Sequence, residues 1–145
     1  MIRELCFQSE FLKIEYLPEL KSLYVTKKGT MNFATYVDAT RITLNTIRER
    51  EVTTRIINIS EMNTLTKLQE KYMEEVYIPE LAHLGIRLVV IIIAPEAYNS
   101  IIFKRLDKHG IHFEYCDNFN TALEITANAM GRQSQNLILD REGRE

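Results

Sequence analysis

Apolar and polar positions change their period several times along the first half of the chain. Leu12–Tyr16 alternates apolar and polar residues, and Leu23–Thr26 is rich in strand-forming residues. The connection between these two runs is short and contains Pro18, so we expect an antiparallel hairpin. From Asn32 to Glu49 the apolar residues recur at steps of three and four, which is the period of a helix.

The middle of the chain repeats this change of period. Thr53–Ile59 is β-branched and predicts a third strand. A second helix follows, with Thr64 as its expected cap, Pro79 as an interruption and Gly85 as its end. Its apolar stripe consists of Leu65, Leu68, Tyr72 and Val76.

The strongest local signal is the continuous apolar run Ile86–Ile93, which predicts a central strand covered on both faces. We expect Ile91→Ala in this run to cost roughly 2–5 kcal/mol. Pro95 is placed to begin a third helix, which Gly110 would close. Ile111–Tyr115 alternates again and predicts the fifth strand. The stripe of the third helix would be Tyr98, Ile102 and Leu106.

A last helix follows, capped by Asp117 or Asn118 and ending before Gly131. The order ββαβαβαβα indicates an α/β fold, in which a single layer of mixed, mostly parallel five-stranded sheet carries about four helices. We expect one domain over residues 1–131. Residues 132–145 would form a polar C-terminal extension, loosely held or docked on another subunit.

Composition fits this picture and excludes several classes of protein. The chain has 145 residues, of which 46% are hydrophobic and 26% charged, as is usual for globular domains. Its net charge of −2 and the lack of a basic block argue against nucleic-acid binding. The run Leu88–Ala94 is too short to span a membrane. With no signal peptide and with Cys6 and Cys116 expected to stay reduced, we expect a cytoplasmic protein.

Motifs of common enzymes are missing from the sequence. The three connections that lead from the third, fourth and fifth strands to the next helix contain no glycine, so a dinucleotide site of the usual type is not expected. Walker, HExxH and GxSxG motifs do not occur. His109 and His112 are separated by Gly110, which argues against a shared metal. We therefore expect no catalytic residue, no metal and no cofactor.

If the domain has a site, the carboxyl ends of the parallel strands are where ligands meet such sheets. Small polar residues there are explained either as helix caps or as a loop that faces a partner or accepts a phosphate. The candidates are Asn58, Ser60, Glu61, Asn63, Thr64, Pro95, Glu96, Asp117 and Asn118.

Several apolar residues lie outside or at the shoulder of their own helical stripe. Scattered exposed apolar residues are normal. If these residues cluster, they form a patch for a protein partner, for a second copy of the chain or for an apolar ligand. The interface candidates are Ile42, Met73, Tyr77, Phe103 and Ile125.

The order of elements and a few short strings resemble the STAS domain, specifically its SpoIIAA-like group, over about residues 10–130. The strings are Leu23–Val25 running into Lys28–Gly29, the helix end Tyr77–Leu81, and Phe113–Asn118 leading into Ala122–Leu123. The resemblance implies a non-enzymatic regulatory or interaction domain, and a possible carrier of a small apolar ligand.

Antagonists of the SpoIIAA-like group carry a phosphorylatable serine in an Asp-Ser-Ser-Gly-like motif after the third strand. Here that neighbourhood runs from Ser60 to Thr66 and lacks both the Asp-Ser pair and the glycine; Asn63-Thr64 is its nearest match. Three hypotheses remain open. The first is a homo-oligomeric protein-interaction domain. The second is a binder of a small apolar or lipid-like molecule, and the third is a switch phosphorylated at Ser60, Thr64 or Thr66.

Overall fold

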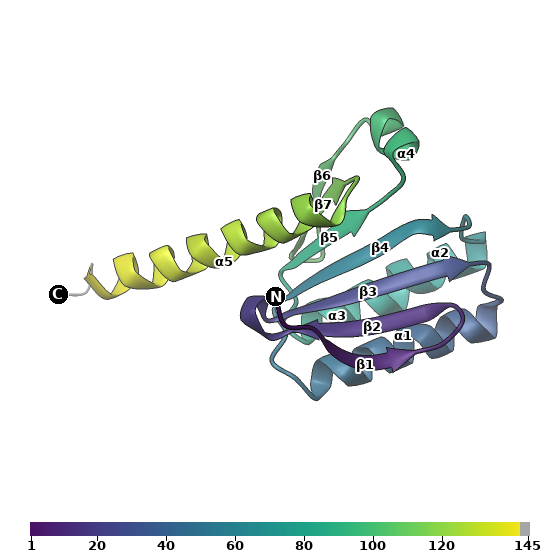
Figure 1. Cartoon of the computed structure of the whole chain (residues 1–145), viewed down its shortest axis with the longest axis horizontal. Helices are drawn as coiled ribbons and strands as arrows, with labels where there is room; N and C mark the ends of the chain where they lie inside the picture. The colour runs from purple at the N-terminus through teal and green to yellow at the C-terminus, as the bar shows by residue number, and fades with distance from the viewer. Residues whose placement is uncertain (143–145) are drawn as a thin grey trace.

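The computed structural model describes the backbone of residues 1–142 and the side chains of residues 1–131. These residues form one seven-stranded sheet with helices on both faces (Figure 1). The strands are β1 (Glu4–Gln8), β2 (Leu12–Leu17), β3 (Ser22–Gly29), β4 (Thr54–Met62), β5 (Leu88–Ile92), β6 (Arg105–Lys108) and β7 (Ile111–Cys116). The helices are α1 (Phe33–Arg48), α2 (Lys67–Tyr72), α3 (Ile78–His83), α4 (Pro95–Ser100) and α5 (Phe119–Glu142). A 3₁₀ turn covers Pro18–Leu20 and a π-helical segment covers Met73–Tyr77.

The strands follow the order β1-β2-β3-β4-β5-β7-β6. The four central strands β3, β4, β5 and β7 are parallel, whereas β1, β2 and β6 join the edges in antiparallel fashion. This confirms the predicted α/β class, with two more strands than expected. β5, the strand with the strongest apolar signal, lies between β4 and β7 at the centre of the sheet.

The predicted helix that was to end at Gly110 is wrong in its second half. α4 stops at Ser100, and Leu106 belongs to strand β6. His109 and Gly110 both have positive φ (53° and 78°), so they form a tight turn that joins β6 to β7. Two consecutive residues of this conformation are typical of a two-residue hairpin loop. Gly110 therefore closes a hairpin rather than a helix.

The sheet divides the apolar core into two layers, and helices cover each of them. α1, α2 and α3 cover one face of the sheet, where Ile14, Val25, Tyr36 and Leu81 are among the buried residues. The first turns of α5 cover the other face, where Tyr24, Ile56, Val90 and Ala122 are buried. We call these the α1 face and the α5 face. Alternate residues of each strand point to opposite faces, so each central strand contributes to both layers.

The segment from α2 to α3 is one helical run with a wider turn in its middle. Thr66 caps α2 in a capping box with Gln69, so the expectation that Thr64 is the cap is wrong. Before Pro79 the helix widens, and the Ile78 N–H donates to the Met73 carbonyl five residues back. Proline clashes with the carbonyl four residues before it, and a single π turn relieves that clash. The predicted interruption at Pro79 is thus a π turn.

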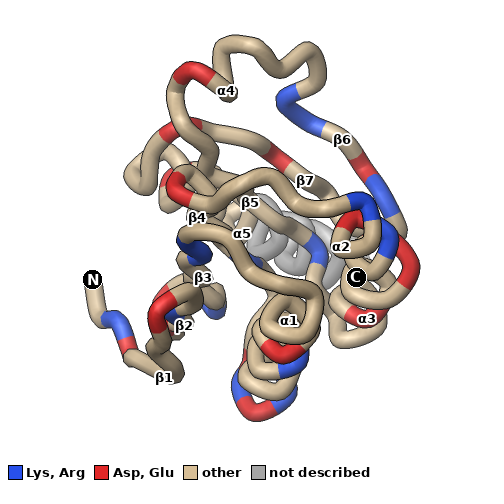
Figure 2. Tube along the Cα trace, turned by 90° about the vertical axis from the view of Figure 1, so that its right-hand side faces the viewer, with Lys and Arg blue, Asp and Glu red and all other residues tan. Residues whose placement is uncertain are grey.

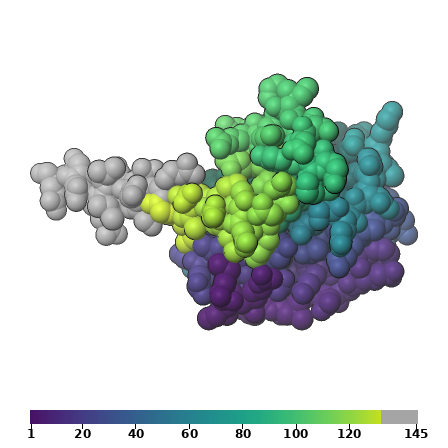
Figure 3. All heavy atoms as spheres, turned by 45° about the horizontal axis from the view of Figure 1, so that its top comes forward, coloured from purple at the N-terminus to yellow at the C-terminus, as the bar shows by residue number. Residues whose placement is uncertain are grey.

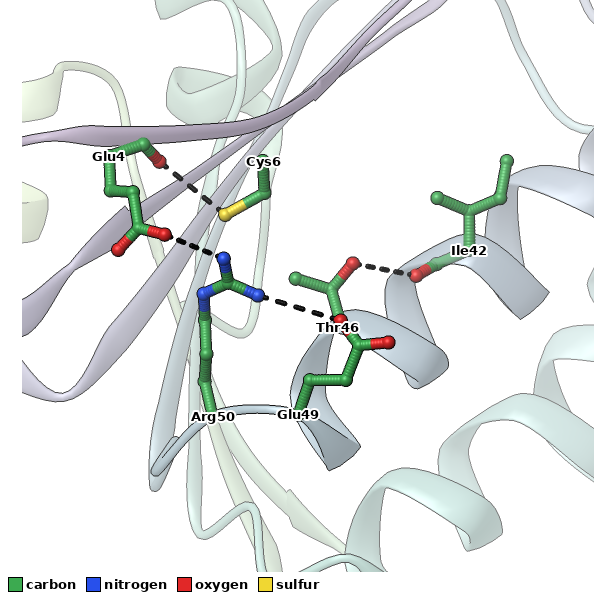
Figure 4. Close-up of polar contacts among 6 residues, drawn as sticks. All are labelled: Glu4, Cys6, Ile42, Thr46, Glu49 and Arg50. Atoms are coloured by element: carbon green, nitrogen blue, oxygen red, sulfur yellow. Dashed lines mark hydrogen bonds and ion pairs between the residues drawn. The ribbon is translucent and has the colours of Figure 1, made fainter.

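At the other end of the sheet, β1 is fixed to the end of α1 (Figure 4). The Arg50 guanidinium pairs with the Glu4 carboxylate at 2.6 Å and with Glu49 at 3.7 Å. Burial raises the pKa of the Cys6 thiol, whose Sγ contacts the Glu4 carbonyl oxygen. A thiol with a raised pKa is a poor nucleophile, so this corner serves packing.

The C-terminal helix differs from the prediction. α5 continues through Gly131, which was expected to end it. The side chains of the predicted polar extension, residues 132–145, lie outside the described part of the chain. No helix among the described residues is long and apolar enough to cross a membrane.

Candidate functional site: a cavity with two buried cations

A cavity of about 250 Å³ lies between the α1 face of the sheet and the run from α2 to α3. Its floor comes from core-facing positions of four neighbouring parallel strands, and the π-helical segment and β6 supply its walls. π turns often occur at functional sites, so the position of Met73–Tyr77 against a cavity is informative. The apolar lining includes Ile57, Ile59, Met62, Leu65, Met73 and Ile91.

Two buried basic side chains, Lys27 and Arg55, are part of this lining, and the exposed Lys108 belongs to its rim. Lys27 follows Leu23 and Val25 at every second position of β3, and Arg55 precedes Ile57 in the same way on β4. Because strand side chains alternate between faces, the period that turns their apolar neighbours inward also turns these two cations inward. Each is only 3% exposed.

Two nitrogens of Arg55, Nε and Nη2, are buried and have no hydrogen-bond partner of normal geometry among the described residues. The Tyr77 hydroxyl likewise lacks such a partner, although the Arg55 guanidinium and the Thr43 side chain are near enough to act on its pKa. No ion pair forms between either cation and a carboxylate of the described residues, and the charge that contributes to the lowered pKa of Lys27 is that of Arg55. Buried charges are usually paired, because an unpaired charge costs much free energy away from water.

Aromatic rings take the place of acidic partners around the two cations. The Tyr77 ring lies 5.5 Å from Lys27 Nζ and 5.0 Å from the Arg55 guanidinium carbon, and the Tyr36 ring lies 5.1 Å from Lys27 Nζ. Burial raises the pKa of Tyr36 and of Tyr77, so both phenols are neutral near pH 7. The rings offer cation–π attraction, which is worth about 0.5–2 kcal/mol, and no negative charge.

Burial and a neighbouring like charge both act on the Lys27 ammonium. Burial, together with the nearby Arg55 guanidinium, lowers the pKa of the Lys27 ammonium to about 7. Both causes disfavour the charged form, since one removes water and the other is a like charge. Arginine does not lose its proton in proteins, so the site keeps at least one positive charge at neutral pH.

Charged side chains also meet at the rim of the cavity. Lys108 of β6 forms an ion pair with Glu74 of the π-helical segment, and both are partly exposed. Figure 2 shows that β6 and the run from α2 to α3 lie side by side there. A shallow depression next to the cavity shares Ile59, Met62 and Met73 with it and is also lined by Asn63 and Thr64.

The polar candidates after the third predicted strand do not form one loop in the structure. Ser60 and Glu61 are exposed residues of β4 itself: the Ser60 hydroxyl donates to Asn58 Oδ1 at 2.7 Å, and Glu61 pairs with Lys28 at 3.6 Å. Asn58 donates to the Tyr24 hydroxyl at 3.2 Å on the α5 face. Asn63 and Thr64 form the loop before α2.

The other loop candidates have structural positions at the starts of helices. Pro95 is in the first turn of α4, and Glu96 follows it, exposed to solvent. Asn118 caps α5, because its Oδ1 accepts the Thr121 N–H at 2.8 Å, and its side-chain amide donates to Asp117 at 2.8 Å. None of these four residues lines the cavity.

The five apolar candidates do not form one surface patch. Tyr77 and Met73 line the cavity, Ile42 is half-buried against the α1-face core, and Ile125 packs against the α5-face core. Only Phe103 is well exposed, at 73%.

Sequence reasoning missed Lys27 and Arg55, although a signal for both was present. A polar residue in a strand is usually taken to point outward. However, along their strands both cations share the alternation of core-facing residues: Lys27 with the buried Leu23 and Val25, and Arg55 with the partly buried Ile57. A cation at a core-facing position is the pattern that marks this site.

The cavity fits a binding site better than a reaction centre. It offers fixed positive charge, aromatic rings and an apolar lining, but its only carboxylate, Glu74, is paired with Lys108 at the rim. Among the described residues, no group of three or more His, Cys, Asp or Glu side chains is placed to hold a metal ion. The described residues thus form an α/β domain with a cavity lined by apolar side chains, aromatic rings and two buried cations.

No protein-family model and no curated protein matches the chain. The chain is similar to the solved structure of the anti-sigma factor antagonist SpoIIAA in its unphosphorylated form, with a TM-score of 0.50 and 11% sequence identity. The match covers 88% of this chain and 98% of that one. The chain therefore has a STAS fold of the SpoIIAA-like kind, as the sequence resemblance implied.

Proposed function

We propose that the protein is a non-catalytic regulatory domain that binds a small molecule in the cavity between its sheet and α2–α3. The observation that carries this proposal is the cavity itself, about 250 Å³ with mostly apolar walls. Ligand sites are typically apolar hollows of about 300–1,000 Å³ with a few convergent polar groups, so a cavity of about 250 Å³ suits a small ligand. The likeness to an anti-sigma factor antagonist supports the regulatory part of the proposal.

Binding of the fluorescent dye anilinonaphthalenesulfonate tests this proposal. We expect saturable binding of one dye molecule per folded chain. Met73→Trp should abolish it because the larger ring fills the cavity. Val76→Trp is the matched control, since Val76 belongs to the same π-helical segment but is exposed. Equal dye binding by both folded variants, or no saturable binding at all, would contradict the proposal.

A second candidate function is contact with a protein, either a partner or another copy of this chain. The segment between α4 and β6 carries two adjacent exposed apolar side chains, Ile102 at 88% and Phe103 at 73% exposure. This segment projects from the body of the sheet (Figures 1 and 3). Sedimentation at several concentrations should show self-association that is lost in Ile102→Ser/Phe103→Ser. A monomer at every concentration would argue against the homo-oligomer.

Phosphorylation at Ser60, Thr64 or Thr66 stays a prediction. All three residues are exposed. Thr64 lines the depression beside the cavity, whereas Thr66 is already engaged as the cap of α2. A phosphate would add about −1.5 to −2 charges at this loop. Phosphopeptide mapping of the protein from its native cells should find the modification at Thr64, and an unmodified loop would remove this alternative.

A further inference from the structure

We propose that the ligand of this cavity is an amphipathic carboxylate, with its single negative head bound between Arg55 and Lys27 and its short apolar tail among the aliphatic side chains. This inference rests on the proposed function and specifies the chemical class of the ligand. It starts from the charge of the site, which holds two buried cations and no paired anion.

The free groups of Arg55 fit a carboxylate in detail. Nε and Nη2 lie on the same side of the guanidinium, and these are the two atoms left without a partner. Two parallel N–H donors match the two oxygens of a carboxylate, and this bidentate pairing is among the strongest polar contacts in proteins. A neutral apolar ligand would leave both donors unpaired and would keep their desolvation cost.

Among the described residues, no acidic side chain occupies the position between the two cations. Glu74, the carboxylate in the lining, is partly exposed and pairs with Lys108 at the rim. Glu15 is buried, but it lies opposite Tyr24 in the strand register, so it belongs to the α5 face, where Arg3 and Lys13 are near it. The described part of the chain thus leaves the two cations to a partner from outside.

The remaining surface of the cavity suits the apolar tail of such a carboxylate. Beside the two cations, the lining is formed by residues such as Ile57, Met62, Leu65, Met73 and Ile91. Methionine side chains adapt to irregular shapes, which suits a flexible alkyl chain. The apolar walls give affinity by burial, and the two cations select the head group.

Isothermal titration with three probes that share one tail tests the inference: octanoate, octanol and octylamine. We expect octanoate to bind the wild-type chain about 10- to 100-fold more tightly than octanol, the range expected for charge-assisted hydrogen bonds. Octylamine should not bind, because its head is a third cation. Equal affinity for octanoate and octanol would overturn the anion inference and leave the proposed function intact. If none of the probes binds, both fail.

Variants separate a ligand role of the cations from a role in folding. Lys27→Met and Arg55→Met should weaken octanoate about tenfold or more and leave octanol binding unchanged or tighter. Lys28→Met is the control, since Lys28 is the next residue of β3 but is exposed and pairs with Glu61. In the ligand-free protein, Lys27→Met should raise the thermal midpoint, because it removes an unpaired buried charge. A lower midpoint together with unchanged octanoate affinity would show that the lysine serves the fold.

Discussion

Lys27 shows what burial does to a single charged residue. Below pH 7 the ammonium is charged in both the folded and the unfolded chain, and the folded chain bears the full cost of its burial. In the unfolded chain its pKa is 10.5, whereas in the folded chain it is about 7. Between these two values the unfolded state binds more protons, so the free energy of unfolding rises with pH across this window.

The first prediction concerns this rise. Urea denaturation of the wild-type protein should give a free energy of unfolding that increases between pH 7 and 9, with a slope approaching about 1 kcal/mol per pH unit. Lys27→Met should remove this part of the slope, and Lys28→Met should keep it. Three other groups face Lys27. Arginine keeps its proton in proteins, and burial raises the pKa of Tyr36 and of Tyr77, so Arg55 and the two tyrosines keep their charge state over this range. Parallel profiles for wild type and Lys27→Met would contradict the prediction.

Two isoleucines on neighbouring strands give a second prediction about packing. Ile56 is fully buried on the α5 face, whereas Ile91 is only half-buried and borders the cavity. We now expect Ile56→Ala to cost about 2–5 kcal/mol, as in a close-packed core, and Ile91→Ala to cost less. Chemical denaturation of both variants measures the difference. An equal or larger cost for Ile91→Ala would mean that the cavity wall is packed as tightly as the core.

The start of α2 gives a third prediction, which concerns the residue that caps the helix. Thr66 accepts the Gln69 N–H at 3.2 Å and forms the capping box, while Thr64 lies two residues earlier in the loop. Thr66→Ala should therefore lower the free energy of unfolding by about 0.5–2 kcal/mol, and Thr64→Ala should change it by less than about 0.5 kcal/mol. The same denaturation experiment distinguishes them, and the reverse order would return the cap to Thr64.

Elements with a regular spacing of apolar residues could be predicted from the sequence, and short polar elements could not. α1 was predicted over 32–49 and is observed over Phe33–Arg48. β6 was missed because Arg105–Lys108 is short, polar and exposed, and only its pairing with β7 makes it a strand. Gly110 follows His109 at positive φ, and a glycine in that position fits a helix end and a hairpin turn equally well.

In the whole molecule, the cavity exists because several elements that are distant in the sequence meet. β3 and β4 bring the cations, the π-helical segment brings Tyr77 and Met73, and β6 closes one side with Leu106 and Lys108. Sequence reasoning found the α/β class, Tyr77 and Met73, but it cannot place a void, because a void depends on how far apart elements pack. The predicted loop residues Asn63 and Thr64 lie in the depression beside the cavity rather than within it.

A crystal structure of the protein with bromine-tagged octanoate tests the carboxylate site directly, because anomalous scattering locates the end of the tail. We expect the carboxylate within hydrogen-bond distance of Arg55 Nε and Nη2, with Lys27 Nζ beside it and the bromine among Met62, Leu65 and Met73. A carboxylate paired with Lys108 at the rim, or a bromine beside Arg55, would contradict this expectation.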